Sequence, residues 1–283
     1  YRKALEIDPK RSSVLSNILF LQSSNSYNLQ AHLKEATNYG KLLTDRIEKP
    51  FSEWKCNKNP KRIRIGFVSG DLYNHPVGYF LESILEKIDT SSVQLFAYSA
   101  HSRHDDLTER IKPFFFSWKN ISYLDNNEAA NLIHDDGIHI LIDLSGHTDR
   151  NRLTMFARKP APIQATWLGY WATTGVKEID YIIGDPYRTP ENEENHFTEK
   201  VWRLPETSLC FTAPKVNIQP GPLPALSNNF ITFGCFNNSV KMTDDVVAIR
   251  AKILEAVPNS RLLLKSKEFN NTSGKKRIIN KFI

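Results

Sequence analysis

Three side chains that can bind a sugar or move a proton fall within five residues of the sequence: Asp71, Asn74 and His75. A loop histidine can donate to a sugar hydroxyl or a phosphate, or exchange a proton near neutral pH. Pro76 follows at the start of a stretch with helical periodicity, where its missing N–H would have had no partner. The free N–H groups of such a helix start can face an anion. The alternative is that Asp71 only caps the helix and that His75 is only a turn residue.

A second group of candidates surrounds the apolar run 138–144, which predicts a buried strand. His147 lies in the polar loop that follows this run, so we expect it to point into the same crevice as His75. His139 lies near the strand start, at the opposite edge of the sheet, where a structural histidine with satisfied hydrogen bonds is the better interpretation. We expect Asp143 in or near the core, with a partner that the sequence does not name.

A third candidate segment, residues 161–175, runs from a predicted strand into a loop with glycines, threonines, two tryptophans and a tyrosine. Small residues such as Gly169 let backbone amides approach a ligand, and aromatic rings such as Tyr170 cover the apolar faces of sugars. Leu168 lies in the same loop. The alternative is a loop that simply packs against the protein.

Lys241 is the fourth candidate, because it lies between a predicted strand at 230–236 and a predicted helix at 244–256. This is a favourable place for a phosphate contact, although a single lysine is usually a solvated charge. The sequence has no P-loop, no dinucleotide-binding glycine motif and no serine nucleophile elbow. It also has no Asp-x-Asp pair in a suitable loop, which argues against a diphosphate held by a metal.

The elements that must position these residues alternate between strands and helices, a pattern that predicts a parallel, doubly wound α/β sheet. In such a sheet the ligand binds at the carboxyl ends of the strands, where the loops with Asp71, His75 and His147 are expected. The predicted helices are 77–88, 105–112, 127–135 and 151–158. The predicted strands are 63–69, 93–99, 114–118, 138–144, 163–168, 179–183 and 200–204.

Three domains follow from this pattern. Residues 1–48 are predicted to be helical, and their Ala-Leu-x-x-x-Pro ending at positions 4–9 resembles the last turn of a tetratricopeptide repeat. After a polar linker, residues 62–210 form a Rossmann-like lobe. After a second, proline-rich linker, residues 230–283 begin another β/α domain. The first residue is not Met and this last domain is incomplete, so we expect the chain to be part of a longer protein.

The composition narrows the classes of function. The chain has 283 residues, of which 40% are hydrophobic and 24% charged, so it can build real cores and is not disordered. A net charge of +6 fits an anionic ligand, and no dense basic stripe favours nucleic acid. No apolar run is long enough to cross a membrane. Three widely spaced cysteines indicate neither a disulfide framework nor a metal site, and favour a reducing, cytoplasmic setting.

Taken together, these segments resemble the protein O-linked N-acetylglucosamine transferase family, including its bacterial homologues and the plant Spindly-type O-fucosyltransferases. The resemblance covers almost the whole chain and consists of several ordered motifs at matching spacings. They lie at residues 64–76, 136–148, 158–164, 167–175, 180–183 and 236–241, after the tetratricopeptide-like ending.

The resemblance implies a GT-B fold, in which two Rossmann-like lobes flank a cleft and follow a superhelix of helical repeats. It also implies metal-independent, inverting transfer of N-acetylglucosamine from UDP-GlcNAc to Ser or Thr hydroxyls of proteins, with acceptors bound through the repeats. No cofactor is expected besides the sugar-nucleotide donor, and neither a nucleic acid nor a membrane is an expected partner. Two alternatives stay open: a Spindly-type protein O-fucosyltransferase, and a non-catalytic tetratricopeptide scaffold with a degenerate transferase lobe.

The resemblance also assigns site residues. His75 matches the family's active-site histidine, with Asp71, Asn74 and Pro76 as its neighbours. Lys241 matches the lysine that stabilises the leaving diphosphate. The substrate-binding positions implied by the resemblance are Asn74, Pro76, His147, Leu168, Gly169, Tyr170 and Asn238.

This chain departs from the animal enzymes at several of the matched positions. His147 replaces a tyrosine, Asn238 a glutamine and Val77 a threonine, and Tyr39 replaces a histidine of the helical transition region. The family's second lobe continues well past residue 283 and holds most of the nucleotide contacts. We therefore expect the 283 residues alone to be inactive.

Overall fold

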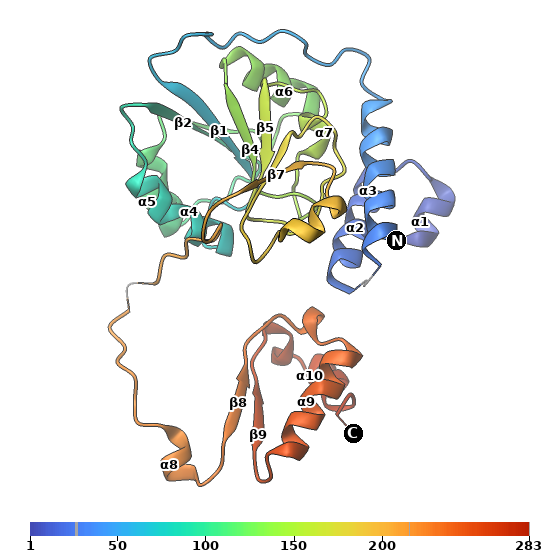
Figure 1. The fold of residues 1–283 in the computed structure, drawn as a ribbon, viewed down its shortest axis with the longest axis vertical. Coiled ribbons are helices and arrows are strands. Elements are labelled where there is room, and N and C mark those ends of the chain that lie inside the picture. Colours follow the sequence, from blue (N-terminus) through green and yellow to red (C-terminus); the bar gives the residue numbers. More distant parts are fainter. Residues whose placement is uncertain (26–27, 215, 283) are drawn as a thin grey trace. The chain divides into compact units, whose positions relative to one another are not determined.

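A parallel sheet forms the centre of the first of two units into which the chain divides, Tyr1–Pro214 and Lys215–Ile283 (Figure 1). The computed structural model describes residues 1–25, 28–214 and 216–282. Within these residues the sheet has seven strands in the order β3-β2-β1-β4-β5-β6-β7. The strands are β1 (Ile63–Ser69), β2 (Val93–Ser99), β3 (Ser117–Asn120), β4 (Ile140–Asp143), β5 (Ile163–Thr166), β6 (Tyr181–Gly184) and β7 (Lys200–Arg203).

This strand order is that of a doubly wound α/β fold, as the alternation in the sequence predicts. Every neighbouring pair runs parallel, and the chain winds outward from β1 in one direction and from β4 in the other. The switch point lies between β1 and β4, where Val68 pairs with Asp143. Loops that leave these two strands diverge, and the crevice between them is the usual ligand site of such sheets.

One predicted strand is placed differently in the structure. The sequence predicts a strand at 114–118, but a 3-10 helix, η1 (Lys112–Phe114), occupies the start of this segment and β3 begins only at Ser117. Pro113 lies inside η1 and has no N–H to donate to a sheet ladder. The strand therefore begins later in the sequence than the hydrophobic residues predict.

Helices cover both faces of the sheet, because successive side chains of a strand point to opposite sides. Phe67 of β1 belongs to a buried cluster with Leu81 and Leu107, whereas its neighbour Val68 belongs to a second cluster with Ile133. Figure 1 shows α4 and α5 on one side, and α6 and α7 on the other. The bounds are α4 (Pro76–Lys87), α5 (Asp106–Ile111), α6 (Asn126–Asp135) and α7 (Leu153–Phe156), with a 3-10 helix η2 (Glu191–His196) before β7.

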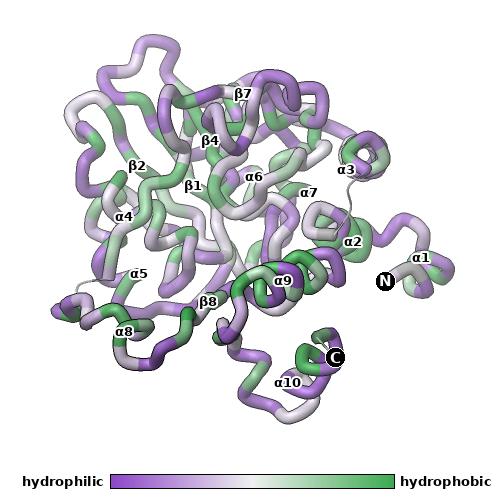
Figure 2. Tube along the Cα trace, turned by 60° about the horizontal axis from the view of Figure 1, so that its bottom comes forward, coloured by the Kyte–Doolittle hydropathy of each residue, from purple (hydrophilic) through white to green (hydrophobic). Residues whose placement is uncertain are grey.

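The N-terminal helices α1 (Arg2–Ile7), α2 (Ser12–Asn25) and α3 (Leu29–Thr44) belong to the same unit as the sheet. Their buried residues Leu19, Ala36 and Leu43 lie in the cluster that contains Val68. Apolar residues concentrate in the middle of α2, which is coloured green in Figure 2. The helical segment is therefore part of the packed core of this unit.

The predicted linker at 49–61 lies along the lobe without forming a helix or strand. The N–H of Phe51 donates to the carbonyl of Arg158 at 2.9 Å, and Nε1 of Trp54 donates to the carbonyl of Lys159 at 2.8 Å. These bonds hold the segment against the chain that follows α7.

The second unit is one β/α/β arrangement with short additional helices. Its strands β8 (Thr232–Cys235) and β9 (Arg261–Leu264) pair in parallel on either side of α9 (Asp244–Ala256) in the sequence. Met242, Val247 and Ile278 form its small core. The remaining elements are α8 (Pro224–Asn228), η3 (Ser239–Lys241), η4 (Lys267–Asn270) and α10 (Thr272–Ile279).

Candidate active site

The carboxyl end of β1 places Asp71 and His75 side by side at the switch point of the sheet. Oδ2 of Asp71 lies 3.8 Å from Nδ1 of His75. The Asp71 side chain is only 12% exposed, whereas that of His75 is 38% exposed. A buried carboxyl group thus stands next to an imidazole that solvent or a substrate can reach.

Local sequence fixes the direction of the His75 ring. His75 is the N-cap of α4, and its Nδ1 accepts a hydrogen bond from the N–H of Val77 at 3.4 Å. Pro76 is the first residue of the helix and is exposed, so its main contribution is to set the helix start. Among the described residues none bonds to Nε2 of His75, which leaves this nitrogen available to a substrate.

Burial raises the pKa of the Asp71 carboxyl group above its usual value, and the neighbouring His75 opposes this rise. Asp149 also raises this pKa, whereas Tyr73 and Arg150 lower it. Asp71 is therefore protonated over a wider pH range than an exposed aspartate.

Asn74 lies in the same turn, but its polar groups already have partners. Its N–H donates to the Asp105 carboxylate at 2.9 Å, and its side-chain amide donates to Asp106 and accepts from the hydroxyl of Tyr79. Asn74 thus links the start of α4 to that of α5. These bonds use one N–H and one lone pair of the exposed side-chain amide, and the role of Asn74 in substrate binding stays a prediction.

The prediction that His147 shares a crevice with His75 is wrong in this structure. The His147 side chain is 1% exposed, and its Nδ1 lies 2.8 Å from Oγ of Ser16. Its Nε2 lies 3.0 Å from the carbonyl oxygen of Thr174. The ring lies inside the protein because α2 covers the loop after β4, a contact across 131 residues of sequence.

Tyr170 is likewise buried, at 2% exposure, and not presented to a ligand. Its hydroxyl lies 3.2 Å from Nε2 of His32 and donates to the carbonyl of Leu19 at 3.4 Å. The aromatic ring that was predicted to cover a sugar instead packs against the N-terminal helices. The physical reason is the same as for His147, since α2 and α3 lie over this loop.

Leu168 and Gly169 form a tight, strained turn at the carboxyl end of β5. Leu168 has φ of +63°, and the N–H of Gly169 donates to the carbonyl of Trp167, two residues earlier, at 2.8 Å. A side chain at Gly169 would lie 2.0 Å from the carbonyl oxygen of Leu144, so only glycine fits. Strain of this kind in a non-glycine residue is typical of functional sites, which favours the predicted role of this turn.

Two buried carboxylates hold the loops after β4 and β5 through hydrogen bonds. The sequence alone assigned neither of them a role. Asp143 accepts from the N–H groups of Ser145 and Gly146, and from Oγ1 of Thr166, and its burial raises its pKa to about 6. Glu199 accepts from the N–H of Thr174 at 2.8 Å. Glu199 lies just before β7, and no local sequence signal connects it to the loop after β5.

His139 fulfils the prediction of a structural histidine. Its Nδ1 accepts from the N–H of Arg64 at 3.0 Å, and its Nε2 lies 2.9 Å from the carbonyl oxygen of Asn57. Both nitrogens serve to hold the chain at the amino end of the sheet.

Lys241 and Asn238 lie in the second unit, at η3 and just before it. Lys241 is exposed, and its N–H donates to the carbonyl of Asn238 at 3.0 Å. Three residues farther on α9 begins at Asp244. That Lys241 and His75 meet at one donor stays a prediction.

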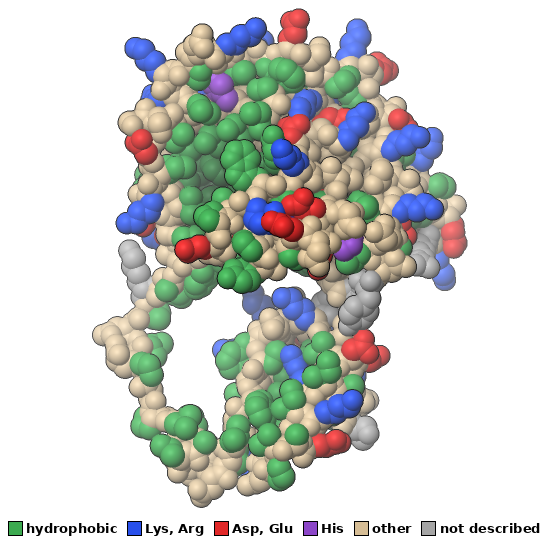
Figure 3. Space-filling model, in the orientation of Figure 1, with side chains coloured by type: hydrophobic (Ala, Val, Ile, Leu, Met, Phe, Trp, Pro, Cys, Tyr) green, Lys and Arg blue, Asp and Glu red, His purple; other side chains and the backbone are tan. Residues whose placement is uncertain are grey.

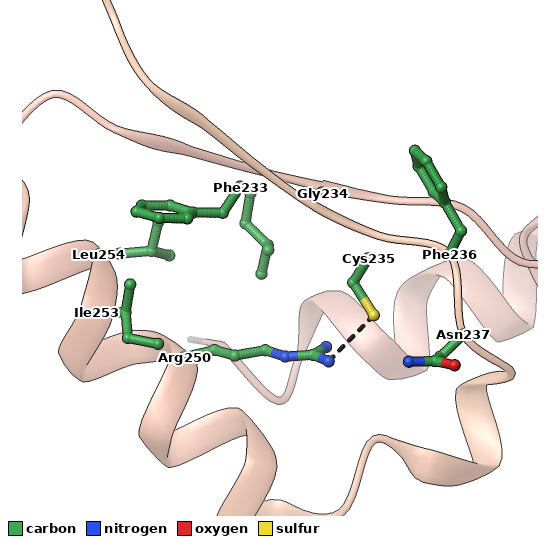
Figure 4. A pocket seen from close by; sticks show the side chains of 9 residues that line it. Phe233, Gly234, Cys235, Phe236, Asn237, Arg250, Ile253 and Leu254 are labelled. Carbon is green, nitrogen blue, oxygen red and sulfur yellow. Dashed lines mark hydrogen bonds between the residues drawn. The ribbon is translucent and has the colours of Figure 1, made fainter. Parts of the chain in front are cut away.

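A cavity of about 310 Å³ lies beside β8 and α9 in the second unit (Figure 4). Nη2 of Arg250 donates to Sγ of Cys235 at 3.0 Å within it. A hydrogen bond from the backbone of Asn237 lowers the pKa of the Cys235 thiol, and Arg250 lowers it further. Sequence reasoning missed Arg250, which lies within an ordinary helical pattern.

The burial of His147 predicts a pH effect on stability. Burial lowers the His147 pKa to about 3, against about 6.5 in an unfolded chain. Between these two pKa values the unfolded chain binds a proton at this histidine, whereas the folded protein does not. Protonation therefore favours the unfolded chain, and the free energy of unfolding decreases as the pH falls below 6.5. Relative to His147→Gln, the wild type should lose about 1.4 kcal/mol of unfolding free energy for each pH unit.

Chemical denaturation of both proteins at pH 7, 5.5 and 4 measures this difference. The raised pKa of Asp143 acts in the opposite direction, but it is shared by the two proteins and cancels in the comparison. A difference between the proteins that does not change with pH would contradict a neutral, buried His147.

No group of three or more His, Cys, Asp or Glu side chains among the described residues is arranged to hold a metal ion. No helix in the described part of the chain has the length and apolar character that a membrane span requires.

Comparison with known proteins identifies the family. The model of glycosyl transferase family 41 matches residues 24–213. A probable UDP-N-acetylglucosamine–peptide N-acetylglucosaminyltransferase SPINDLY of Petunia hybrida is 36% identical over 280 residues, which are 97% of this chain and 30% of that relative. A UDP-N-acetylglucosamine–peptide N-acetylglucosaminyltransferase of Caenorhabditis elegans is 42% identical over 153 residues, 53% of this chain and 13% of the relative.

Among solved structures, the chain is similar to a lysine-to-methionine mutant of the O-GlcNAc transferase of Thermobaculum terrenum. The TM-score is 0.89 at 35% identity, over 99% of this chain and 53% of that one. The α/β architecture is therefore that of a GT-B transferase, while the chain spans about 30% of the length of the SPINDLY relatives it matches. The predicted resemblance is confirmed: this chain belongs to glycosyl transferase family 41.

Proposed function

We propose that this protein transfers N-acetylglucosamine from UDP-GlcNAc to Ser or Thr hydroxyls of other proteins, with inversion and without a metal. The observation that carries the proposal is the Asp71–His75 pair, which lies at the switch point of the sheet with Nε2 of His75 available to a substrate. The relatives are named as UDP-N-acetylglucosamine–peptide N-acetylglucosaminyltransferases, which supports the same donor and acceptor classes.

In this reaction the acceptor hydroxyl attacks the anomeric carbon from the face opposite UDP. The new carbon–oxygen bond forms as the bond to the diphosphate oxygen breaks, and the bonding electrons leave with UDP. Nε2 of His75 can take the hydroxyl proton only in the tautomer that carries its hydrogen on Nδ1, facing Asp71. In the tautomer that accepts from the N–H of Val77, Nε2 is a donor and the proton passes to a phosphate oxygen. Asp71, next to Nδ1 of His75, orients the ring and stabilises its charged form.

Negative charge develops on the leaving diphosphate, and a cation near it lowers the barrier. We assign this role to Lys241, which precedes α9 by three residues and is exposed. The strained turn of Leu168 and Gly169 would contact the sugar or the path of the acceptor.

The proposal includes protein acceptors that approach along the N-terminal helical segment, and a cytoplasmic location. The three cysteines of the described chain are unpaired, which suits a reducing compartment. On the face of the first unit shown in Figure 3, Lys and Arg side chains are interspersed with Asp and Glu. That distribution supports a protein acceptor over a nucleic acid.

A Spindly-type O-fucosyltransferase is the second candidate, because Spindly-type chains share much of the motif pattern that carries the sequence resemblance. A thermal-shift screen separates the two. If the first proposal is right, UDP-GlcNAc raises the melting temperature of the protein expressed from its whole gene, and GDP-fucose and UDP-glucose do not. Stabilisation by GDP-fucose alone would favour the second candidate.

Transfer of radiolabelled N-acetylglucosamine from UDP-GlcNAc to a peptide pool tests the activity directly. Label is expected on Ser and Thr residues, with the β-linked product that inversion requires. Binding of UDP-GlcNAc without any transfer to peptides or proteins would overturn the proposed function.

Lys241→Ala should lower kcat by roughly a hundredfold, the scale of one lost charge-stabilising group in a transition state. The KM for the acceptor peptide should change little, because the charge develops on the diphosphate. Lys252→Ala, which removes another exposed lysine of the same unit, is the control and should keep wild-type kcat. An unchanged kcat in Lys241→Ala would remove this residue from the mechanism.

A further inference from the structure

The loops that follow β4 and β5 interlock through two close contacts, each at a glycine. A Cβ on Gly146 would lie 2.3 Å from Cβ of Tyr170, and a Cβ on Gly169 would lie 2.0 Å from the carbonyl oxygen of Leu144. Gly146 has φ of +53°, so the turn also needs its conformational freedom. The Leu168–Gly169 turn therefore depends on the position of the loop after β4.

His147 supplies the polar connection between these loops, and its bonds define its tautomer. The carbonyl of Thr174 can only accept, so Nε2 must carry the hydrogen in this 3.0 Å bond. In the neutral ring Nδ1 then accepts from the hydroxyl of Ser16 at 2.8 Å. Ser16 Oγ in turn accepts from Nδ2 of Asn151 at 3.2 Å, so each of these groups has a partner.

The same ring connects the helical segment to the site loops. It packs edge-on against Tyr39 of α3, with ring centroids 4.9 Å apart, and against Tyr170, with centroids 5.2 Å apart. Ser16 comes from α2. The ionisable groups nearest the ring are Tyr39, Tyr170 and His32. Two buried carboxylates hold the same loops, Asp143 through the N–H of Gly146 and Glu199 through the N–H of Thr174.

We propose that His147 is a positioning residue: as the neutral Nε2–H tautomer it ties α2 to the loops after β4 and β5 and so holds the Leu168–Gly169 turn in place. The proposed positioning of the loops rests only on the hydrogen bonds and ring contacts of His147 given above. Its consequence for sugar transfer rests on the proposed function.

Hydrogen–deuterium exchange tests the positioning without any assay of activity. His147→Phe keeps an aromatic ring but removes both hydrogen bonds, and should speed amide exchange in residues 144–150 and 167–175 by about tenfold. His147→Gln has a donor and an acceptor at similar reach and should restore most of the protection. Exchange in β2, which these bonds do not touch, should stay at the wild-type rate.

His139→Phe is the matched control, because that histidine also uses both ring nitrogens but at the amino end of the sheet. It should leave exchange in residues 144–150 and 167–175 unchanged. Equal acceleration by His139→Phe, or acceleration spread over the whole unit in His147→Phe, would mean a general structural role and would overturn the proposal.

Ser16→Ala removes the bond from the side of the helix and should accelerate the same two segments, by less than His147→Phe does. In the double variant Ser16→Ala/His147→Phe the effects should not add, because both substitutions remove the same hydrogen bond. No effect of Ser16→Ala would show that α2 takes no part in holding the loops. Additive effects would show that Ser16 acts on them without His147, and either result would overturn the proposed connection.

Nitrogen NMR of ¹⁵N-histidine-labelled protein tests the tautomer. His147 should give one protonated and one unprotonated ring nitrogen, with Nε2 as the protonated one, and these signals should persist between pH 7 and 5. An Nδ1–H form, or titration within this range, would overturn the assignment.

In the protein expressed from its whole gene, His147→Phe should raise the KM for UDP-GlcNAc by about tenfold, while His147→Gln stays close to wild type. Loss of loop protection with unchanged donor KM would overturn the link between this turn and the donor. If the wild-type protein neither binds nor transfers the sugar, the proposed function is wrong. The hydrogen–deuterium exchange result would still test the positioning of the loops by His147.

Discussion

Replacing His75 with alanine is expected to abolish most sugar transfer, with kcat lowered by a hundredfold or more. The ring is the group at the switch point of the sheet that combines solvent access with a carboxyl neighbour, at 3.8 Å from Asp71. The substitution removes the donor or acceptor at Nε2 and the charge that Asp71 would balance. Steady-state transfer of radiolabelled N-acetylglucosamine to a peptide measures the loss.

His104→Ala is the control for this variant. His104 is an exposed histidine whose ring pairs with Glu109 of α5 and not with Asp71. Its removal should leave kcat unchanged. His75→Ala also removes a weak helix cap, so its melting temperature is measured in parallel. Wild-type turnover by a folded His75→Ala protein would place the chemistry elsewhere.

Gly40→Ala should destabilise the first unit by about 3 kcal/mol or more, the upper range for overpacking a core. A Cβ at this position would lie 1.7 Å from the carbonyl oxygen of Gly175 and 2.6 Å from its carbonyl carbon. Both are backbone atoms, so relief requires movement of α3 away from the loop after β5. Helix propensity alone predicts the opposite sign, a gain of about 1 kcal/mol.

Thermal and chemical unfolding followed by circular dichroism measure this effect, and Gly221→Ala is the matched control. A Cβ at Gly221 would have no atom within 4 Å, so that variant should be neutral or slightly stabilised. A stabilised Gly40→Ala protein would show that α3 does not lie against the loop at Gly175.

Much of the sheet could be predicted from sequence, because parallel strands buried on both faces are continuous apolar runs. β1 and β2 begin and end at the predicted residues 63–69 and 93–99. The turn with Asp71 and His75 was found in the same way, since strand, polar turn and helix are all signals of local sequence. His139 was predicted correctly because its place at a strand start already put it at the edge away from the site.

His147 and Tyr170 could not be predicted from their own segments. Each lies in a loop whose composition suits a ligand, and each was assigned to one. The contacts that bury them come from Ser16, Leu19 and His32, more than 130 residues away in the chain. No periodicity or motif within the loops carries that information.

The sequence by itself determined the order of strands and helices, and the chemical groups at the end of β1, because hydrophobic periodicity and turn chemistry act over a few residues. The tertiary structure alone decided which polar side chains face outward. Packing of α2 and α3 onto the loops after β4 and β5 turned His147 and Tyr170 inward and left His75 accessible beside a buried Asp71. Burial is a property of contacts between distant segments, and it sets both the pKa of a group and its access to a substrate.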